Sequence, residues 1–290
     1  MTATPLIADG ARLELLWTGA VWSEGPVWLP ETQRLRWSDI PSNVIMEHDA
    51  ASGETYVHRR EVEFTNGRTL DREGRVVQCS HGRRSIEYEI DGRPVTLVDR
   101  WGHSRLNSPN DVVVASDGSI WFTDPPYGIL NPAEGHPGKL EYGGCFVFRF
   151  DPGTGELRPV VTDLQRPNGL AFSPDESLLY VSDTADEQRG RIRAYPVDVR
   201  AGSVGEGRDF ATVVPGCSDG FRVDVEGRIW SSSLDAVQVI SPGGVIVERI
   251  PVPEKIANLC FGGPDGQDLY VVATSSLYRI RTTTQQAARP

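Results

Sequence analysis

Short apolar runs alternate with turn residues along the whole chain, and one arrangement of them recurs six times. In the third copy, Ser108-Pro-Asn-Asp111 leads into the β-branched run 112–114, Asp117-Gly118 reverses the chain, and Ile120-Trp-Phe-Thr123 follows. An Asp-Gly pair between two β-rich runs is a strong hairpin signal, because the reversal needs a positive φ that glycine adopts without steric cost. The pattern therefore predicts a strand hairpin at each copy.

Each copy opens with one Glu, Asp or Asn directly ahead of an apolar strand. These leading residues are Glu24, Asn66, Asn110, Asn168, Asp219 and Asn258. Repeats of roughly 40–50 residues, each with about four short strands, are typical of β-propeller blades. The sequence thus predicts an all-β fold, a six-bladed β-propeller that occupies residues 1–290 as a single domain. Because inner strands line the channel of a propeller, we expect the six leading residues to form a ring of oxygen atoms at one mouth.

The two ends of the chain are expected to meet in the last blade. The run Leu13-Glu-Leu-Leu-Trp17 reads as a strand ahead of the first repeat, and Leu277-Tyr-Arg-Ile280 is the last strand pattern. Pairing of the two would remove an open sheet edge. We expect residues 1–12 and 282–290, which lie outside this pattern, to be poorly ordered.

Residues 125–144 form a long connection without a strand pattern. Long connections of this kind are usually functional or disordered. Two interpretations stay open for it, a loop that covers the channel mouth and a surface excursion.

Composition and net charge indicate which kinds of molecule the protein can bind. The chain is 39% apolar and 24% charged, as in globular proteins, and lacks the long helical periodicities of a doubly wound α/β fold. A net charge of −11 disfavours nucleic acid and anionic membranes as partners and leaves a small neutral molecule or a cation.

Targeting signals and cysteine pairs are absent from the sequence. The chain has no apolar run of the ~20 residues that a membrane span needs and no secretory pattern at its start. Its four cysteines lack metal-type spacing. We expect a cytoplasmic protein, either a monomer or a weak homodimer.

The predicted ring offers two carboxylates and four carboxamides. Without His or Cys, zinc is disfavoured, whereas Ca²⁺ accepts six to eight oxygen ligands in flexible geometry. One divalent cation is therefore expected, with Ca²⁺ preferred and Mg²⁺, Mn²⁺ or Zn²⁺ as alternatives. Asn and Asp ahead of glycine are also common turn formers. Six of them in register, with Glu in one place, favour the metal.

Four stretches of the chain resemble the gluconolactonase family, also called SMP-30/luciferin-regenerating-enzyme-like. They are Ser23-Glu-Gly-Pro-Val-Trp28, Ser108-Pro-Asn-Asp111, Arg166-Pro-Asn-Gly-Leu-Ala-Phe-Ser-Pro-Asp175 and Ser218-Asp-Gly-Phe-Arg-Val-Asp224. The resemblance covers all six repeats. It implies a six-bladed propeller that hydrolyses sugar lactones, although some members accept aryl esters or organophosphates.

The resemblance also implies site residues. A divalent metal would be held by Glu24, Asn168 and Asp219 with Asn110 close by, and Asp219 would handle the proton. Two positions depart from the animal members, which carry Arg where this chain has Ser108 and Glu near Tyr127. With Pro125-Pro-Tyr127, the substrate-facing wall looks more like that of the bacterial branch.

Lactone hydrolysis needs a nucleophile and stabilisation of the developing oxyanion. A divalent ion polarises the carbonyl and lowers the pKa of water, and a nearby carboxylate accepts the proton. Asp219 is the predicted general base and Glu24 a pure ligand. We expect Asn110, Tyr127 and His81 to line the substrate pocket, with His81 as a candidate auxiliary acid.

Other functions remain open at this point. One is hydrolysis of organophosphate or aryl esters at the same ion, and another is a non-catalytic propeller that serves as a binding platform. The absence of the long helical periodicities of an α/β fold disfavours a serine hydrolase of the α/β type.

Overall fold

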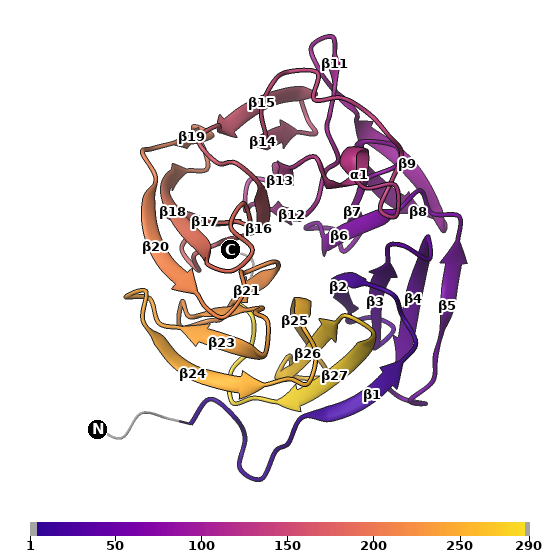
Figure 1. Ribbon diagram of the computed structural model, residues 1–290, viewed down its shortest axis with the longest axis vertical. Helices are drawn as coiled ribbons and strands as arrows, with labels where there is room; N and C mark the ends of the chain where they lie inside the picture. Colours follow the sequence, from indigo (N-terminus) through magenta and orange to yellow (C-terminus); the bar gives the residue numbers. More distant parts are fainter. Residues whose placement is uncertain (1–4, 288–290) are drawn as a thin grey trace.

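Six antiparallel sheets surround a central axis in the computed structural model, which describes residues 5–287 (Figure 1). The sheets follow one another around the axis in chain order, and α1 (Tyr127–Leu130) is the only α-helix in the described part of the chain. The predicted all-β, six-bladed β-propeller is confirmed.

Within each blade, the strand nearest the axis comes first in the chain, and the strands that follow it lie progressively farther from the axis. The first blade holds β2 (Ser23–Leu29), β3 (Arg34–Asp39), β4 (Val44–Asp49) and β5 (Thr55–Arg60). The second holds β6 (Thr65–Leu70), β7 (Val76–Ser80), β8 (Ser85–Ile90) and β9 (Arg93–Val98). The third holds β12 (Val112–Val114), β13 (Ile120–Asp124), β14 (Phe146–Asp151) and β15 (Glu156–Val161).

The second half of the chain repeats this order. The fourth blade holds β16 (Pro167–Phe172), β17 (Leu178–Asp183), β18 (Gly190–Asp198) and β20 (Arg208–Val213), with β19 (Ser203–Val204) paired to β18. The fifth holds β21 (Phe221–Val223), β22 (Ile229–Ser231), β23 (Ala236–Ile240) and β24 (Ile246–Pro251). The sixth holds β25 (Ile256–Gly262), β26 (Asp268–Ala273) and β27 (Ser276–Arg281). A small hairpin, β10 (Arg100–Trp101) with β11 (Ser104–Arg105), projects between the second and third blades.

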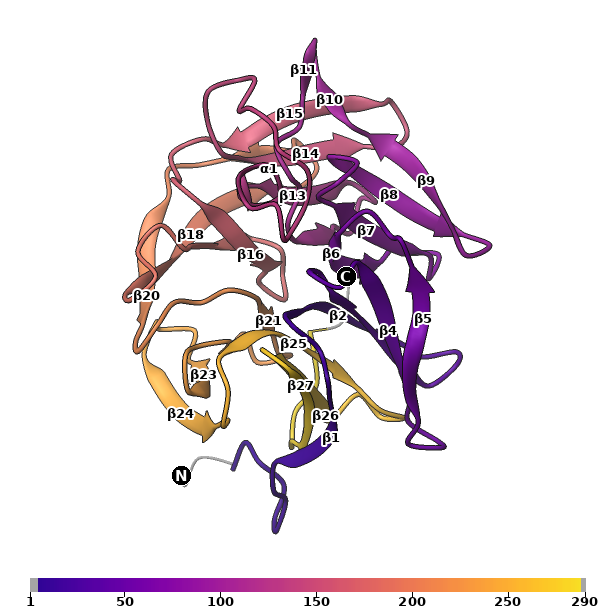
Figure 2. The same ribbon diagram turned by 45° about the vertical axis from the view of Figure 1, so that its right-hand side comes forward.

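The N-terminal strand β1 (Glu14–Thr18) completes the sixth blade. It pairs antiparallel with β27, with Leu15 opposite Tyr278, and Figure 2 shows the two strands side by side. The Trp17 ring also lies 5.8 Å from the Trp37 ring of the first blade. The predicted closure of the propeller by the first strand is therefore confirmed.

The segments beyond this closure are bound to the propeller. The Ala8 amide donates to the Arg281 carbonyl of β27 at 3.1 Å, and the Ala287 amide donates to the Val223 carbonyl of β21 at 2.9 Å. The expectation of poor order is thus corrected for residues 5–12 and 282–287, because their backbone groups find partners on the sixth and fifth blades. Residues 1–4 and 288–290 of the two segments lie outside the described residues.

Apolar side chains fill the space between neighbouring sheets. One cluster joins Val77 and Ile86 of the second blade to Phe122 and Phe148 of the third. The four cysteines are all buried and form no disulfide with one another. Within residues 5–287, no helix has the length and apolar character needed to cross a membrane. The core therefore lies between the blades, and the axis is left to polar residues.

Candidate active site

The ring residues leave the regular strand ladder where they approach the axis. The pairing register shifts between Glu24 and Val27 in β2, and again beside Asn66 in β6 and Asn168 in β16. Such bulges bend a strand and redirect a side chain, and they are frequent next to active sites. The bulges allow side chains from separate blades to converge on one space.

Glycines after the ring residues allow neighbouring blades to approach. A Cβ atom on Gly67 would lie 2.4 Å from the Asn110 carbonyl oxygen, and one on Gly169 would lie 2.4 Å from that of Asp219. The Gly169 amide instead donates to the Asp219 oxygen at 2.9 Å. These glycines lie in inner strands and serve close contact between blades, so the alternative of simple turn formers is wrong for them.

Five of the six ring residues line one cavity of about 270 Å³. Asn258 is the exception and contacts Glu24 instead. The lining residues from the ring are Glu24, Asn66, Asn110, Asn168 and Asp219. The remaining ones are Trp22, Ile40, Tyr127, Asn131, Glu134, Arg166, Thr184, Glu187, Cys217 and Lys255. The cavity is therefore predominantly polar and carries charges of both signs.

The two ring carboxylates are destabilised as anions by their surroundings. Burial, followed by the negative charge of Asp219, raises the pKa of Glu24 well above its usual range, against a hydrogen bond from the Gly25 amide. Burial likewise raises the pKa of Asp219 to about 7, although Lys255 opposes this shift. Neighbouring buried acids repel each other when both are ionised, and a cation between them removes that cost.

The donor atoms suit a hard divalent cation. Two carboxylates and several amide oxygens are the ligand types that Ca²⁺ accepts. Of the Glu24 carboxylate, Oε2 is held by Gly25 and Asn258, and no hydrogen bond within residues 5–287 engages Oε1. No cluster of three or more His, Cys, Asp or Glu side chains placed to hold a metal occurs within residues 5–287, so a cation here would also need amide oxygens as ligands.

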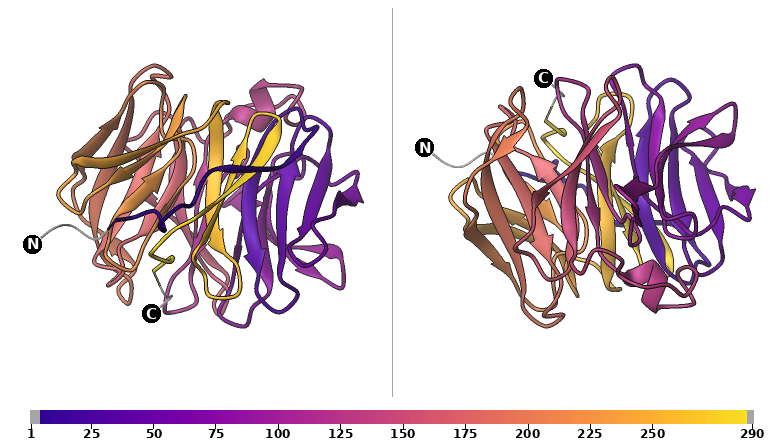
Figure 3. Two further views of the ribbon diagram at one scale, coloured as in Figure 1. Left: turned by 90° about the horizontal axis from the view of Figure 1, so that it is seen from below. Right: turned by 90° about the horizontal axis from the view of Figure 1, so that it is seen from above.

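Tyr127 lines the cavity, as expected, and belongs to α1 in the loop 125–144. Its hydroxyl hydrogen-bonds to Thr184, and its ring lies 5.9 Å from the Arg166 guanidinium carbon. Ser108 holds the start of this loop, because its hydroxyl donates to the Pro125 carbonyl at 2.6 Å and accepts from the Gly128 amide at 3.0 Å. The side views in Figure 3 place α1 on one face of the propeller. The loop thus contributes to one wall of the cavity.

His81 is placed differently from the expectation. It is fully buried and does not line the cavity. Its Nε2 atom lies 3.2 Å from Asn66 Nδ2, and its Nδ1 atom lies 3.0 Å from the Glu134 carbonyl oxygen. Burial lowers the pKa of His81 to about 4. The segment around Gly128 packs against its imidazole, and this packing separates His81 from the substrate space.

Several lining residues were missed by the sequence reasoning. Trp22, Arg166 and Cys217 each lie two positions before a ring residue. Alternate residues of an extended chain face the same side, so this spacing is a signal that could have found them. Lys255 carries no such signal, and its ammonium group lies 5.0 Å from the Trp22 ring centre.

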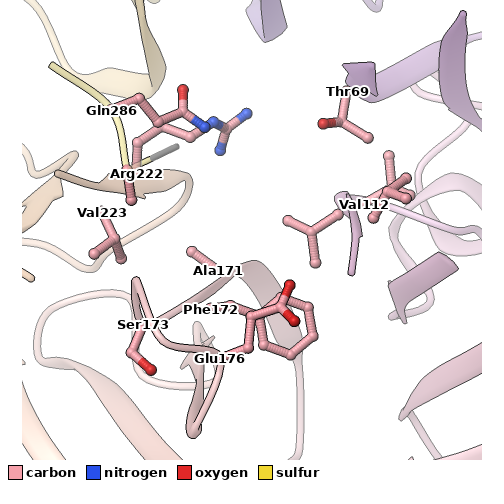
Figure 4. A pocket seen from close by; sticks show the side chains of 12 residues that line it. Thr69, Val112, Ala171, Phe172, Ser173, Glu176, Arg222, Val223 and Gln286 are labelled. Carbon is pink, nitrogen blue, oxygen red and sulfur yellow. The ribbon is translucent and has the colours of Figure 1, made fainter. Parts of the chain in front are cut away.

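A smaller cavity of about 70 Å³ occupies the other end of the inner strands. Figure 4 shows Arg222 beside Gln286 of the C-terminal segment, opposite Thr69, with Phe172 and Glu176 below them. The Glu176 carboxylate is already engaged by the Ser116 amide at 2.8 Å. No ring residue lines this cavity, so the candidate active site is the larger one.

Comparison with known proteins places the chain in a family. The sequence model of the SMP-30/gluconolactonase/LRE-like region matches residues 22–275. The chain belongs to this family. A gluconolactonase of Zymomonas mobilis subsp. mobilis is 32% identical over 298 residues, covering 94% of this chain and 82% of that protein.

Two further relatives extend over similar lengths. Pentonolactonase XacC of Haloferax volcanii is 30% identical and covers 93% of this chain and 84% of its own length. A solved gluconolactonase structure from Xanthomonas campestris is 38% identical, with a TM-score of 0.89, 96% of this chain covered and 94% of that one. The likeness therefore spans almost the whole length of the propeller.

Proposed function

We propose that this protein is a lactonase that hydrolyses a sugar lactone to the aldonic acid with one bound divalent cation, Ca²⁺ in preference to Mg²⁺. The observation that carries the proposal is the convergence of Glu24 and Asp219, from opposite halves of the chain, on one polar cavity with three ring amides. Relatives described as a gluconolactonase and a pentonolactonase support the same reaction class.

The cation would be held by Glu24, Asn168 and Asp219, with Asn110 as the fourth protein ligand. When bound, a divalent cation polarises the lactone carbonyl and lowers the pKa of water. Glu24 is suited to a pure ligand role because its Oε2 atom is already held by Gly25 at 2.8 Å and Asn258 at 3.2 Å. A fixed Glu24 carboxylate would hold the cation, which leaves Asp219 to act as the general base.

Asp219 accepts the proton of the attacking water. Asp219 is partly exposed and lines the cavity, so one oxygen of its carboxylate would bind the cation while the other accepts the proton. The oxygen of water forms a bond to the carbonyl carbon, the ring C–O bond breaks, and the leaving oxygen takes up a proton. The only product is the aldonic acid, because opening of the lactone ring adds one water molecule and releases no other fragment.

The remaining wall would bind the hydroxyl groups of the sugar. Asn110 and Asn131 offer amide donors and acceptors, and Tyr127 offers a phenol hydroxyl. Arg166 and Lys255 add two cationic donors for the oxyanion that develops on the carbonyl or for the product carboxylate. This lining favours a polyhydroxylated lactone over an apolar ester.

Acid release from glucono-1,5-lactone, corrected for spontaneous hydrolysis, tests the proposal. Chelation should abolish the enzymatic rate, and Ca²⁺ should restore it more fully than Mg²⁺. A paraoxon and aryl-acetate panel in the same assay separates the ester-hydrolase alternative, and binding without turnover would indicate a platform. Lactone hydrolysis that survives complete chelation would overturn the cation, and absence of hydrolysis from the Ca²⁺-loaded protein would overturn the lactonase.

A further inference from the structure

Three groups form a hydrogen-bonded chain from the loop 125–144 to the ring. The Glu134 carbonyl lies 3.0 Å from His81 Nδ1, and His81 Nε2 lies 3.2 Å from Asn66 Nδ2. His81 is fully buried and Asn66 is 2% exposed. The loop is therefore connected to Asn66 through one imidazole that has no contact with the cavity itself.

The chemistry of the three groups fixes the direction of each hydrogen bond. A backbone carbonyl only accepts, so His81 Nδ1 carries the proton and donates to Glu134. In the neutral imidazole, Nε2 then has a bare lone pair and accepts from the Asn66 amide nitrogen. Burial, which lowers the pKa of His81 to about 4, keeps the ring in this neutral form near pH 7.

This direction determines how Asn66 is oriented. With Nδ2 turned to His81, the carboxamide oxygen points away from the imidazole, and Asn66 lines the cavity. That oxygen is buried and finds no hydrogen-bond partner in the described chain. A buried acceptor without a partner is unfavourable, so the site favours a ligand that donates a hydrogen bond to this oxygen.

Packing holds His81 in this orientation. A Cβ atom on Gly128 would lie 2.5 Å from His81 Cβ, so only glycine lets the loop approach so closely. The loop is also fastened to the second blade by His136, whose Nε2 atom lies 2.9 Å from the Glu63 carboxylate. The backbone at Gly128 thus packs directly against the His81 side chain.

We propose that His81 is a positioning residue that turns the Asn66 carboxamide oxygen into the cavity, where it accepts a hydrogen bond from a hydroxyl group of the sugar lactone. The inference rests on the proposed lactonase function and deepens it, because it assigns one acceptor that recognises polyhydroxylated substrates. His81 touches no substrate and transfers no proton in this arrangement.

The test compares Asn66→Ala, His81→Phe and the double variant with the full chain in steady-state assays on glucono-1,5-lactone. Each single variant should raise KM by about tenfold with kcat within about twofold, the loss of one hydrogen bond to substrate. The double variant should resemble Asn66→Ala, because His81 acts only through that residue. His48→Phe is the matched control, since His48 is also buried but contacts Thr55 in the outer strands, and its KM should stay unchanged.

Three results would overturn the inference. The first is an unchanged KM in Asn66→Ala. The second is a KM in the double variant that is raised by the product of the two single-variant factors. The third is a loss of bound Ca²⁺ in Asn66→Ala, which would make Asn66 a cation ligand. Should His81→Phe fail to fold, His81→Leu and His81→Gln take its place, since Gln keeps an acceptor for Asn66 and Leu does not; equal KM in the two variants would overturn the positioning role. Turnover by the unchanged protein in the same assay reports on the proposed function, so failure of that function is recognised separately.

Discussion

Asn258 donates a hydrogen bond of 3.2 Å to the Glu24 carboxylate across 234 positions of sequence. It joins the sixth blade to the first at the ring. The Asn258 oxygen accepts from the Leu259 amide at 2.8 Å, which fixes the nitrogen toward Glu24. Both partners of Glu24 engage Oε2, and no hydrogen bond within residues 5–287 engages Oε1. The closure of the propeller therefore also orients a carboxylate oxygen for a ligand.

Glu24→Gln should weaken cation binding, because it removes one of two negative charges while keeping the shape of the side chain. We expect the Kd for Ca²⁺ to rise at least about tenfold, a loss of about 1.4 kcal/mol, measured by titration calorimetry. Glu134→Gln is the matched control, since Glu134 lines the same cavity outside the ring. Equal Ca²⁺ affinity in Glu24→Gln and the unchanged protein would remove Glu24 from the ligand set.

Gly169→Ala should destabilise the propeller. The added methyl group would lie 2.4 Å from the Asp219 carbonyl oxygen, a backbone atom that cannot move without separating two blades. Overpacking of this kind costs about 1–3 kcal/mol, measurable by urea unfolding. Gly243→Ala is the control, because its nearest neighbour is Ser241 Oγ at 3.7 Å, and its effect should stay within about 0.5 kcal/mol. Equal stability of the two variants would show that close approach does not explain Gly169.

The sequence predicted the fold and the ring because both rest on local signals. An Asn168-Gly169 pair ahead of an apolar run is visible in a few residues, and its recurrence at blade-length intervals gives the architecture. Lys255 and Thr184 could not be found in this way, because the loops that bring them to the cavity follow no periodic pattern.

His81 illustrates a different limit of sequence reasoning. Its place after the second hairpin put it near the mouth, but only packing decides that the loop covers it. The C-terminal segment is similar, since its polar composition indicates disorder although Thr282 and Thr284 are buried in the folded chain. In both cases tertiary contacts decide the structure. A short stretch of sequence does not encode these contacts, so the prediction made from the local sequence was wrong.

Deletion of residues 1–18 should lower the melting temperature. It removes β1, exposes the edge of β27 and takes away the contact between Trp17 and Trp37. Loss of partly buried side chains worth about 2 kcal/mol or more corresponds to a fall of at least about 3 °C. Deletion of residues 1–12 leaves β1 in place and should cost less. Identical melting temperatures for the two deletions would mean that β1 does not close the sixth blade in solution.

Asp219→Asn distinguishes an enzyme from a binding platform most directly. Asparagine keeps a neutral oxygen for the cation but cannot accept the proton of water at pH 7. We expect turnover of glucono-1,5-lactone to fall by roughly 10²–10⁴-fold, the usual range for removal of a positioned base. Ca²⁺ content, measured on the same sample at raised ion concentration, should survive. The matched control is Glu187→Gln, which removes a negative charge from the same cavity outside the ring, and its turnover should stay within about twofold of that of the unchanged protein.

The response of Asp219→Asn to added Ca²⁺ decides which role the carboxylate has. A general base cannot be replaced by more cation, so the defect should persist at saturating Ca²⁺. Full recovery at high Ca²⁺ would make Asp219 a ligand alone and assign the proton to another group, with Glu134 the next carboxylate in the cavity. Undiminished turnover would exclude the ring as the place of hydrolysis, because the other ring carboxylate, Glu24, has one oxygen held by the Gly25 amide and by Asn258.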